Sequence, residues 1–273
     1  MPSDFTEETA TDAVVASFAH TEDPRLREVL GSLTRHLHGF VRDVEPTQAE
    51  WETAIAFLTG VGAMCDAKRQ EFILLSDVLG VSMLVDAINN RVPAGATEST
   101  VLGPFHVVAS PRRALGDDLA DVSEGERLLV RGRVLTLDGQ PVAGAEVDVW
   151  HADAEGFYDV QKDHTPDQDL RGLFVTDAEG RFWFRTVLPS HYPIPDDGPV
   201  GDLLRRTSRH PYRPAHIHLI AAAEGHRPVT THLFVEGSPY LDDDTVFGVK
   251  QSLVRPVTVE GDDRVLDFDV TLT

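Results

Sequence analysis

Short strand-like runs separated by turn residues fill the second part of this 273-residue chain and narrow the folds open to it. Their apolar, β-branched and aromatic residues are typical of half-buried strands. Turn residues at 177–180 and around Gly225 predict two β-hairpins. Because no helical pattern lies between the runs, they predict an antiparallel β-sandwich rather than a parallel α/β sheet. The predicted strands cover residues 128–135, 145–151, 172–176, 181–187, 216–223, 229–235 and 265–272.

The chain before about residue 105 has a helical pattern instead. Asp23 followed by Pro24 is a typical helix start, and the apolar residues that follow recur at helical spacing. Thr47 and Glu50 form a capping-box pattern ahead of a second helix. A third helical stretch is predicted over residues 68–90.

These patterns predict an α+β protein with a helical segment at 1–105 and a β-sandwich domain at 106–273. The 45 acidic and 24 basic residues give a net charge of −21, which should repel nucleic acid and anionic membrane surfaces. No signal-peptide pattern and no long apolar run are present, so we expect a cytoplasmic protein. Cys65 is the only cysteine, which excludes an intramolecular disulfide and a thiolate zinc site.

Two histidines in the predicted strand 216–223 share one face of the sheet, because side chains two residues apart in a strand point the same way. His216 and His218 could therefore bind one ion, and imidazole suits zinc, copper, nickel or iron. In a hairpin that turns about Gly225, His232 lies opposite His218 on the neighbouring strand. We therefore expect His232 beside the same site.

Tyr158 and Tyr192 are two of only four tyrosines, and each lies in a segment with turn or proline signals. A tyrosinate is a hard, anionic, electron-rich ligand, so two tyrosines joined to two histidines favour Fe(III) over a soft or divalent ion. The competing arrangement is a ferrous site with two histidines and one carboxylate. The nearest downstream carboxylate, Glu224, lies six residues after His218, about 20 Å along an extended strand, and cannot bind the same ion.

Read with its flanking residues, this set of four resembles the intradiol ring-cleaving dioxygenases. The resemblance covers nearly the whole chain and is weakest before about residue 46. It is carried, in family order and at similar spacing, by residues 97–105 (Thr-Glu-Ser-Thr-Val-Leu-Gly-Pro-Phe), 143–151 (Ala-Gly-Ala-Glu-Val-Asp-Val-Trp-His), 156–158 (Gly-Phe-Tyr), 188–195 (Leu-Pro-Ser-His-Tyr-Pro-Ile-Pro) and 213–218 (Arg-Pro-Ala-His-Ile-His).

The resemblance implies one Fe(III) per chain, bound by Tyr158, Tyr192, His216 and His218, with O2 and an aromatic diol as substrates. It further implies that Tyr192 leaves the ion when substrate binds and that Arg213 stabilises negative charge on the substrate. Many relatives have a glutamine near His232, so we expect hydrogen bonding rather than metal ligation from it. The family also implies a homodimer through the N-terminal helices, with a phospholipid-like molecule at that interface.

The segment 71–80 resembles the part of the catechol-type subfamily that forms one wall of the substrate pocket. An acidic residue at Asp77 resembles the hydroxyquinol-cleaving branch, whose substrate has a third hydroxyl that can donate a hydrogen bond to a carboxylate. The expected product is 3-hydroxy-cis,cis-muconate. The implied pocket residues are Leu74, Asp77, Gly103, Pro104, Phe105, Ile194, Pro195, Val246 and His232.

Two alternatives remain open at this point. One is a catechol or chlorocatechol 1,2-dioxygenase that uses the same iron chemistry. The other is a non-catalytic β-sandwich binding module, because residues 137–147 also resemble transthyretin-like and surface-protein repeats. Such a module has no reason to place two tyrosines and two histidines in register.

Overall fold

The computed structural model describes residues 4–66, 69–162 and 168–273. By its internal contacts the chain divides into two compact units, between Thr59 and Gly60, which are described separately here. The helices are α1 (Ala10–Ser17), α2 (Pro24–Val44), α3 (Gln48–Ala63), α4 (Glu71–Val78), α5 (Val81–Asn89) and α6 (Pro199–Arg206). Among the described residues, no helix is both long enough and apolar enough to cross a membrane.

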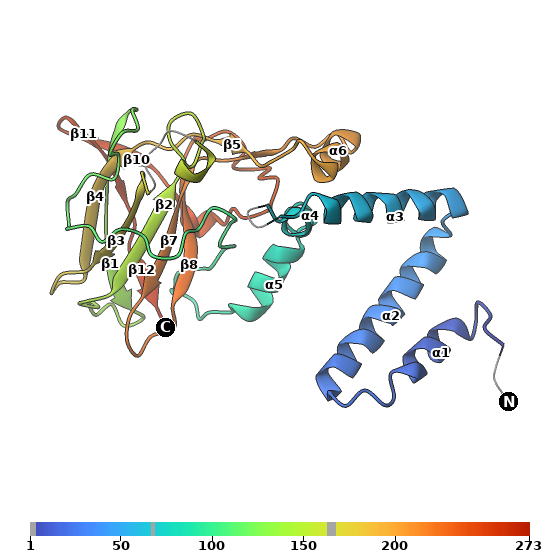
Figure 1. The fold of residues 1–273 in the computed structure, drawn as a ribbon. Helices are drawn as coiled ribbons and strands as arrows, with labels where there is room; N and C mark the ends of the chain where they lie inside the picture. Colours follow the sequence, from blue (N-terminus) through green and yellow to red (C-terminus); the bar gives the residue numbers. More distant parts are fainter. Residues whose placement is uncertain (1–3, 67–68, 163–167) are drawn as a thin grey trace. The chain divides into compact units, whose positions relative to one another are not determined.

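The first unit is helical, as predicted. The side chain of Asp23 accepts hydrogen bonds from the first two backbone amides of α2, which explains why the helix begins there. In the capping box ahead of α3, the carboxylate of Glu50 accepts from the Thr47 amide at 2.8 Å, and the Thr47 hydroxyl accepts from the Glu50 amide at 3.3 Å. Helix α1, which the sequence analysis did not predict, packs beside α2 (Figure 1).

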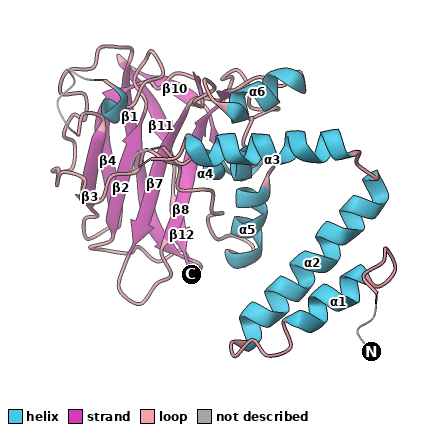
Figure 2. Cartoon of the chain, turned by 45° about the vertical axis from the view of Figure 1, so that its right-hand side comes forward, coloured by secondary structure: helices cyan, strands magenta, loops and turns pink. Residues whose placement is uncertain are grey.

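The second unit contains two five-stranded sheets (Figure 1, Figure 2). In one, β10, β11, β1 and β12 are neighbours in that order and β4 also pairs with β1; in the other, the order is β3-β2-β7-β8-β9. The apolar core lies between the two sheets and includes Phe174, Phe182 and Phe184. The strands are β1 (Arg127–Thr136), β2 (Glu146–His151), β3 (Arg171–Val175), β4 (Arg181–Val187), β5 (Tyr192–Pro193), β6 (Tyr212–Arg213), β7 (His216–Ala222), β8 (Val229–Val235), β9 (Val254–Arg255), β10 (Val257–Glu260), β11 (Asp263–Asp267) and β12 (Val270–Leu272).

The predicted sandwich is confirmed, with two corrections to its strand pairing. The hairpin predicted at 177–180 is wrong, because β3 pairs with β2 whereas β4 pairs with β1 in the opposite sheet. The turn itself is present, but a turn signal specifies a chain reversal and not the sheet that the next strand joins. The sheets are also not purely antiparallel, since β1 pairs in parallel with β11 and β12, and β8 with β9.

The helical stretch predicted at 68–90 consists of two helices, α4 and α5, and Lys68 lies outside the described residues. The break falls at Gly80, whose φ of 70° is left-handed and ends the first helix. The proline-rich connection from 189 to 214 contains α6 and a two-stranded ribbon in which β5 pairs with β6. This ribbon places Tyr192 directly opposite Arg213.

Candidate metal centre and substrate pocket

The candidate site lies on the outer face of the β3-β2-β7-β8-β9 sheet. Along β7, Ile217 and Leu219 belong to the core between the sheets, so the alternation of a strand turns His216 and His218 to the other face. The hairpin predicted around Gly225 is confirmed, and His218 pairs with His232 in β8. All three histidines are buried, and their nitrogens lie within 4.8 Å of one another, close enough to hold a metal ion.

Both predicted tyrosines reach the same point from outside this sheet, Tyr158 from a loop and Tyr192 from β5. The hydroxyl of Tyr158 lies 2.9 Å from Nε2 of His218 and 3.3 Å from the hydroxyl of Tyr192. Nε2 of His216 lies 3.2 Å from Nε2 of His218. The structure therefore brings together two phenol oxygens and two imidazole nitrogens, all buried, which is a donor set that fits a trivalent ion.

Neighbouring groups fix the two imidazole rings on β7. Nδ1 of His216 donates to the carbonyl of Pro214 at 2.8 Å, which leaves the Nε2 lone pair directed into the site. The indole of Trp150 stacks on His218 with the ring centroids 4.7 Å apart and the planes 10° from parallel. The rings are therefore held in one orientation by the protein itself.

The environment favours neutral histidines. Burial lowers the pKa of His216 and His218 well below the ordinary 6.5, and nearby Arg213 adds to this effect for both. Burial also raises the pKa of the Tyr158 phenol well above 10, with Tyr192 adding to the shift. A tyrosinate at this place therefore requires a cation beside it, and the neutral imidazoles are already in the form that binds metal.

Arg213 is buried beside these groups. Its Nη1 lies 3.3 Å from Nε2 of His216, while Nε and Nη2 each donate to the carboxylate of Asp244 at 3.1 Å. The charge of Asp244 raises the pKa of Arg213 against the opposing effect of burial. The guanidinium therefore stays charged next to the candidate metal centre.

A cavity of about 520 Å³ opens beside this centre. It is bounded by α4 on one side and by residues 104–107 on the other, and four of the predicted pocket residues line it: Leu74, Pro104, Phe105 and Pro195. The ring of Phe105 stacks on Tyr158 with centroids 4.4 Å apart. The cavity therefore adjoins one of the candidate ligands.

The remaining predicted pocket residues are placed as follows. A Cβ on Gly103 would meet Cε1 of His218 at 2.9 Å, so Gly103 lies against the histidine. Asp77 is 7% exposed, and burial raises its carboxyl pKa while Arg213 opposes the shift. Ile194 and Val246 are buried apolar residues, and like Asp77, Gly103 and His232 they do not line the 520 Å³ cavity.

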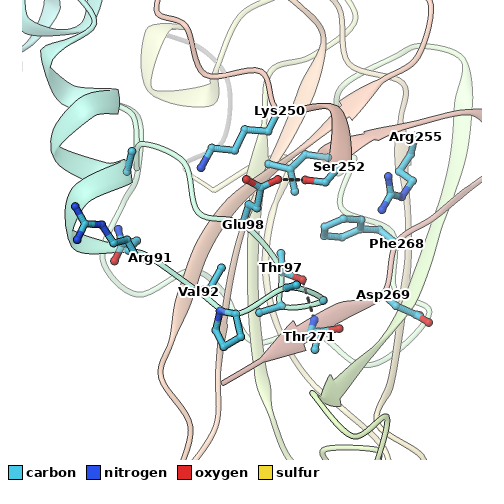
Figure 3. A pocket seen from close by; sticks show the side chains of 17 residues that line it. Arg91, Val92, Thr97, Glu98, Lys250, Ser252, Arg255, Phe268, Asp269 and Thr271 are labelled. Atoms are coloured by element: carbon cyan, nitrogen blue, oxygen red, sulfur yellow. Dashed lines mark hydrogen bonds between the residues drawn. The ribbon is translucent and has the colours of Figure 1, made fainter.

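A larger cavity of about 690 Å³ lies elsewhere, near the end of α5 and β12 (Figure 3). Two of its charged groups are engaged within the protein: Glu98 accepts a hydrogen bond from Ser252, and Nζ of Lys250 donates to the Ser99 carbonyl at 2.6 Å. None of the predicted site residues lines it. Cavity size alone therefore does not locate the chemistry in this molecule.

Sequence reasoning missed three groups at the centre: Trp150 beneath His218, the Pro214 carbonyl at His216, and Asp244 at Arg213. The sequence contained a signal for the position of Trp150. Residues 148, 150 and 152 alternate with the core-facing positions of β2, so they belong to the outer face of the sheet. Asp244 ends an Asp-Asp-Asp run at 242–244, a pattern that ordinarily indicates a solvated surface.

Comparison with known proteins gives a consistent result over the whole chain. The family described as "Dioxygenase" matches residues 104–273, and "Catechol dioxygenase N terminus" matches residues 23–97. A hydroxyquinol 1,2-dioxygenase from Rhizobium sp. is 56% identical, over 92% of this chain and 85% of the relative. A 6-chlorohydroxyquinol 1,2-dioxygenase from Cupriavidus pinatubonensis is 50% identical over 98% of both chains. The crystal structure of hydroxyquinol 1,2-dioxygenase from Pseudomonas putida matches with a TM-score of 0.94 and 45% identity, covering 97% of this chain and 98% of that one.

Proposed function

This chain belongs to the intradiol ring-cleavage dioxygenase family, and on that premise we propose that it cleaves hydroxyquinol. The reaction joins benzene-1,2,4-triol to O2, breaks the ring bond between the two adjacent hydroxyls, and gives 3-hydroxy-cis,cis-muconate, the enol form of maleylacetate. Both oxygen atoms of O2 enter the product, so no further reductant is consumed. The observation that carries the proposal is the convergence of Tyr158, Tyr192, His216 and His218 beside a cavity.

The proposed cofactor is one ferric ion per chain, held by those four side chains. Two phenol oxygens supply the hard anionic donors that suit Fe(III), and two neutral imidazoles complete the set. His232 is also close, with its ring centroid 4.3 Å from that of His218. We assign it a supporting role, because four ligands are already present without it.

When bound, ferric iron would hold the two adjacent hydroxyl oxygens and lower their pKa, so that the substrate binds as an electron-rich diolate that can react with O2. The protein's own groups do the rest. Oη of Tyr192 would accept the proton of one substrate hydroxyl and leave the centre, while the other proton would pass to solvent and Tyr158, His216 and His218 would go on holding the ion. The guanidinium of Arg213, fixed in a dry site, stabilises the negative charge that develops on the ring.

The cavity between α4 and residues 104–107 is the proposed substrate pocket. Its apolar walls, among them Leu74 and Phe105, suit the faces of an aromatic ring. Asp77, on the buried side of α4, is proposed to accept a hydrogen bond from the third hydroxyl of hydroxyquinol. This contact would distinguish hydroxyquinol from catechol and chlorocatechols, which the same iron chemistry would otherwise accept.

We further propose that residues 1–105 serve dimerisation and form part of the pocket wall, while 106–273 hold the metal. The support is the apolar stripe of α2, which is left open within its own unit: Leu33 and Leu37 are each 52% exposed. A second copy of this stripe would cover it, and a phospholipid-like molecule at the interface is part of the same proposal.

Metal content and colour test the assignment of the ligands. The wild-type protein should contain one iron per chain and be red or burgundy from tyrosinate-to-iron charge transfer, and binding of catechol should shift the colour. His216→Ala and His218→Ala should lose the iron. His226→Ala, in the turn of the same hairpin, is the matched control and should keep it. Stoichiometric zinc, or a colourless protein loaded with iron, would contradict the proposal.

A further inference from the structure

We propose that Asp244 is a positioning residue that holds the Arg213 guanidinium in its working orientation, an inference that rests on the proposed function of Arg213. The carboxylate accepts from two donors along one edge of the guanidinium, Nε and Nη2, at 3.1 Å each. Only Nη1 then remains on the side of the metal centre, 3.3 Å from His216. A two-point contact of this kind fixes rotation as well as position.

The loop around Asp244 is built to hold that carboxylate in place. Its oxygens also accept from the backbone amides of Val246 at 3.3 Å and Gly248 at 3.0 Å. A Cβ on Gly248 would meet Nη2 of Arg213 at 2.8 Å, so the loop backbone packs closely against the ion pair. The same carboxylate therefore orders the chain at Val246, a predicted wall of the substrate pocket.

The ion pair is also connected to the tyrosine that is proposed to leave the metal. Arg213 lies in β6, opposite Tyr192 in β5, and the amide next to Asp244 donates to the Tyr212 carbonyl at 3.2 Å. The loop at Asp244 and Thr245 thus holds both the Arg213 side chain and the backbone of β6. A shift of the carboxylate would move the guanidinium relative to the developing charge, where small displacements are costly for catalysis.

The acidic run at 242–244 supplies matched controls. Asp242 and Asp243 are exposed, and Asp243 reaches only His210, with Oδ2 3.1 Å from Nε2. Asp244 alone is buried, with 2% of its side chain exposed. Asp242→Asn and Asp244→Asn therefore make the same chemical change two residues apart, once at the surface and once against Arg213.

The test measures iron content, thermal stability, kcat and KM for hydroxyquinol in Asp242→Asn, Asp244→Asn, Arg213→Gln and the double variant Arg213→Gln/Asp244→Asn. Asp242→Asn should match the wild type. Asp244→Asn should keep iron and colour, and its kcat should fall on the order of 10-fold or more, with a smaller change in KM. The double variant should be no more than about threefold below Arg213→Gln, because the carboxylate has no guanidinium left to orient.

The double variant keeps the proposal testable if Asp244→Asn fails to fold, because the double variant removes the buried carboxylate and its cation together. It should be more stable than Arg213→Gln, which leaves a buried carboxylate without its cation. Two results would overturn the inference: wild-type kcat in Asp244→Asn, or a double variant that loses on the order of 10-fold beyond Arg213→Gln. A wild-type protein that consumes no O2 with any diol would overturn the proposed function instead.

Discussion

Asp77 shows how one residue can be costly for stability and useful for selectivity. Burial is the main cause that raises its carboxyl pKa above the ordinary 3.8, against the opposing effects of Ser82 and Arg213. Between 3.8 and the raised value, the folded protein holds the proton more tightly than the unfolded chain. Stability therefore falls as the pH rises through this interval, and the loss is complete above the raised pKa.

Asp77→Asn should consequently raise the melting temperature at neutral pH, with no gain well below pH 3.8. The same change should lower activity on hydroxyquinol on the order of 10-fold, because a hydrogen bond to a charged group is lost, and should affect catechol much less. Melting curves and oxygen uptake on both substrates measure this, with the exposed helical residue Asp43→Asn as the control. Equal losses on both substrates would mean that Asp77 supports the fold and does not read the third hydroxyl.

His151 is a second residue whose burial has a measurable consequence. Its Nδ1 donates to the Ala152 carbonyl and its Nε2 accepts from the Thr186 hydroxyl, each at 2.7 Å, while burial lowers its pKa from 6.5 to about 4. The unfolded chain binds this proton first as the pH falls. The stability that the neutral ring contributes is therefore complete above pH 6.5 and is lost between 6.5 and about 4.

His151→Gln should weaken the pH dependence of stability between pH 6.5 and about 4, because the glutamine amide can still form hydrogen bonds but does not titrate. The free energy of unfolding of the wild type should fall by about 2 kcal/mol more than that of the variant between about pH 7.5 and about pH 5. Denaturant unfolding of both proteins at the two pH values provides the comparison. Parallel changes in the two proteins would show that His151 is not the source of the effect.

At the level of elements, features that depend on neighbouring residues were predictable from the sequence. The capping box at Thr47, the strand alternation that puts His216 and His218 on one face, and the register of His232 are all local. The sheet that β4 joins after the turn at 177–180 could not be predicted, because it depends on pairing with β1, about 50 residues away in the chain. Asp244 was missed for the same reason: its partner Arg213 lies 31 residues away in the chain, on the far side of the β7–β8 hairpin.

The segment before the pocket gives a prediction at this scale. Gly103 has a φ of 77° and no room for a Cβ beside His218, whereas a Cβ on Gly95, whose φ is 93°, would meet no atom of the described residues within 4 Å. Both glycine-to-alanine changes strain the backbone similarly, but only Gly103→Ala also pushes on a proposed metal ligand. Gly103→Ala should therefore lower iron occupancy and Gly95→Ala should not, as measured by metal analysis. Equal occupancy in the two variants would argue against close packing of Gly103 on the centre.

At the level of the whole molecule, the open stripe on α2 leads to a prediction about assembly. The wild type should be a dimer at micromolar concentration. Leu33→Glu together with Leu37→Glu should shift it to monomer, because charged side chains would then face the apolar stripe of the partner copy. Light scattering measures the mass directly. The exposed polar pair Arg35→Glu and His36→Glu on the same helix is the control, and a stable wild-type monomer would contradict the proposal.

The proposed reaction is defined by the ring bond at which O2 is inserted and by the number of its oxygen atoms that the product keeps. The most direct measurement supplies hydroxyquinol and isotopically labelled O2 to the iron-loaded protein and identifies the product by mass spectrometry and NMR. We predict 3-hydroxy-cis,cis-muconate, or its keto form maleylacetate, opened between the adjacent hydroxyls and labelled in both new carboxyl groups. A product with a single labelled atom, ring opening beside the diol to a semialdehyde, or no oxygen uptake at all would contradict it.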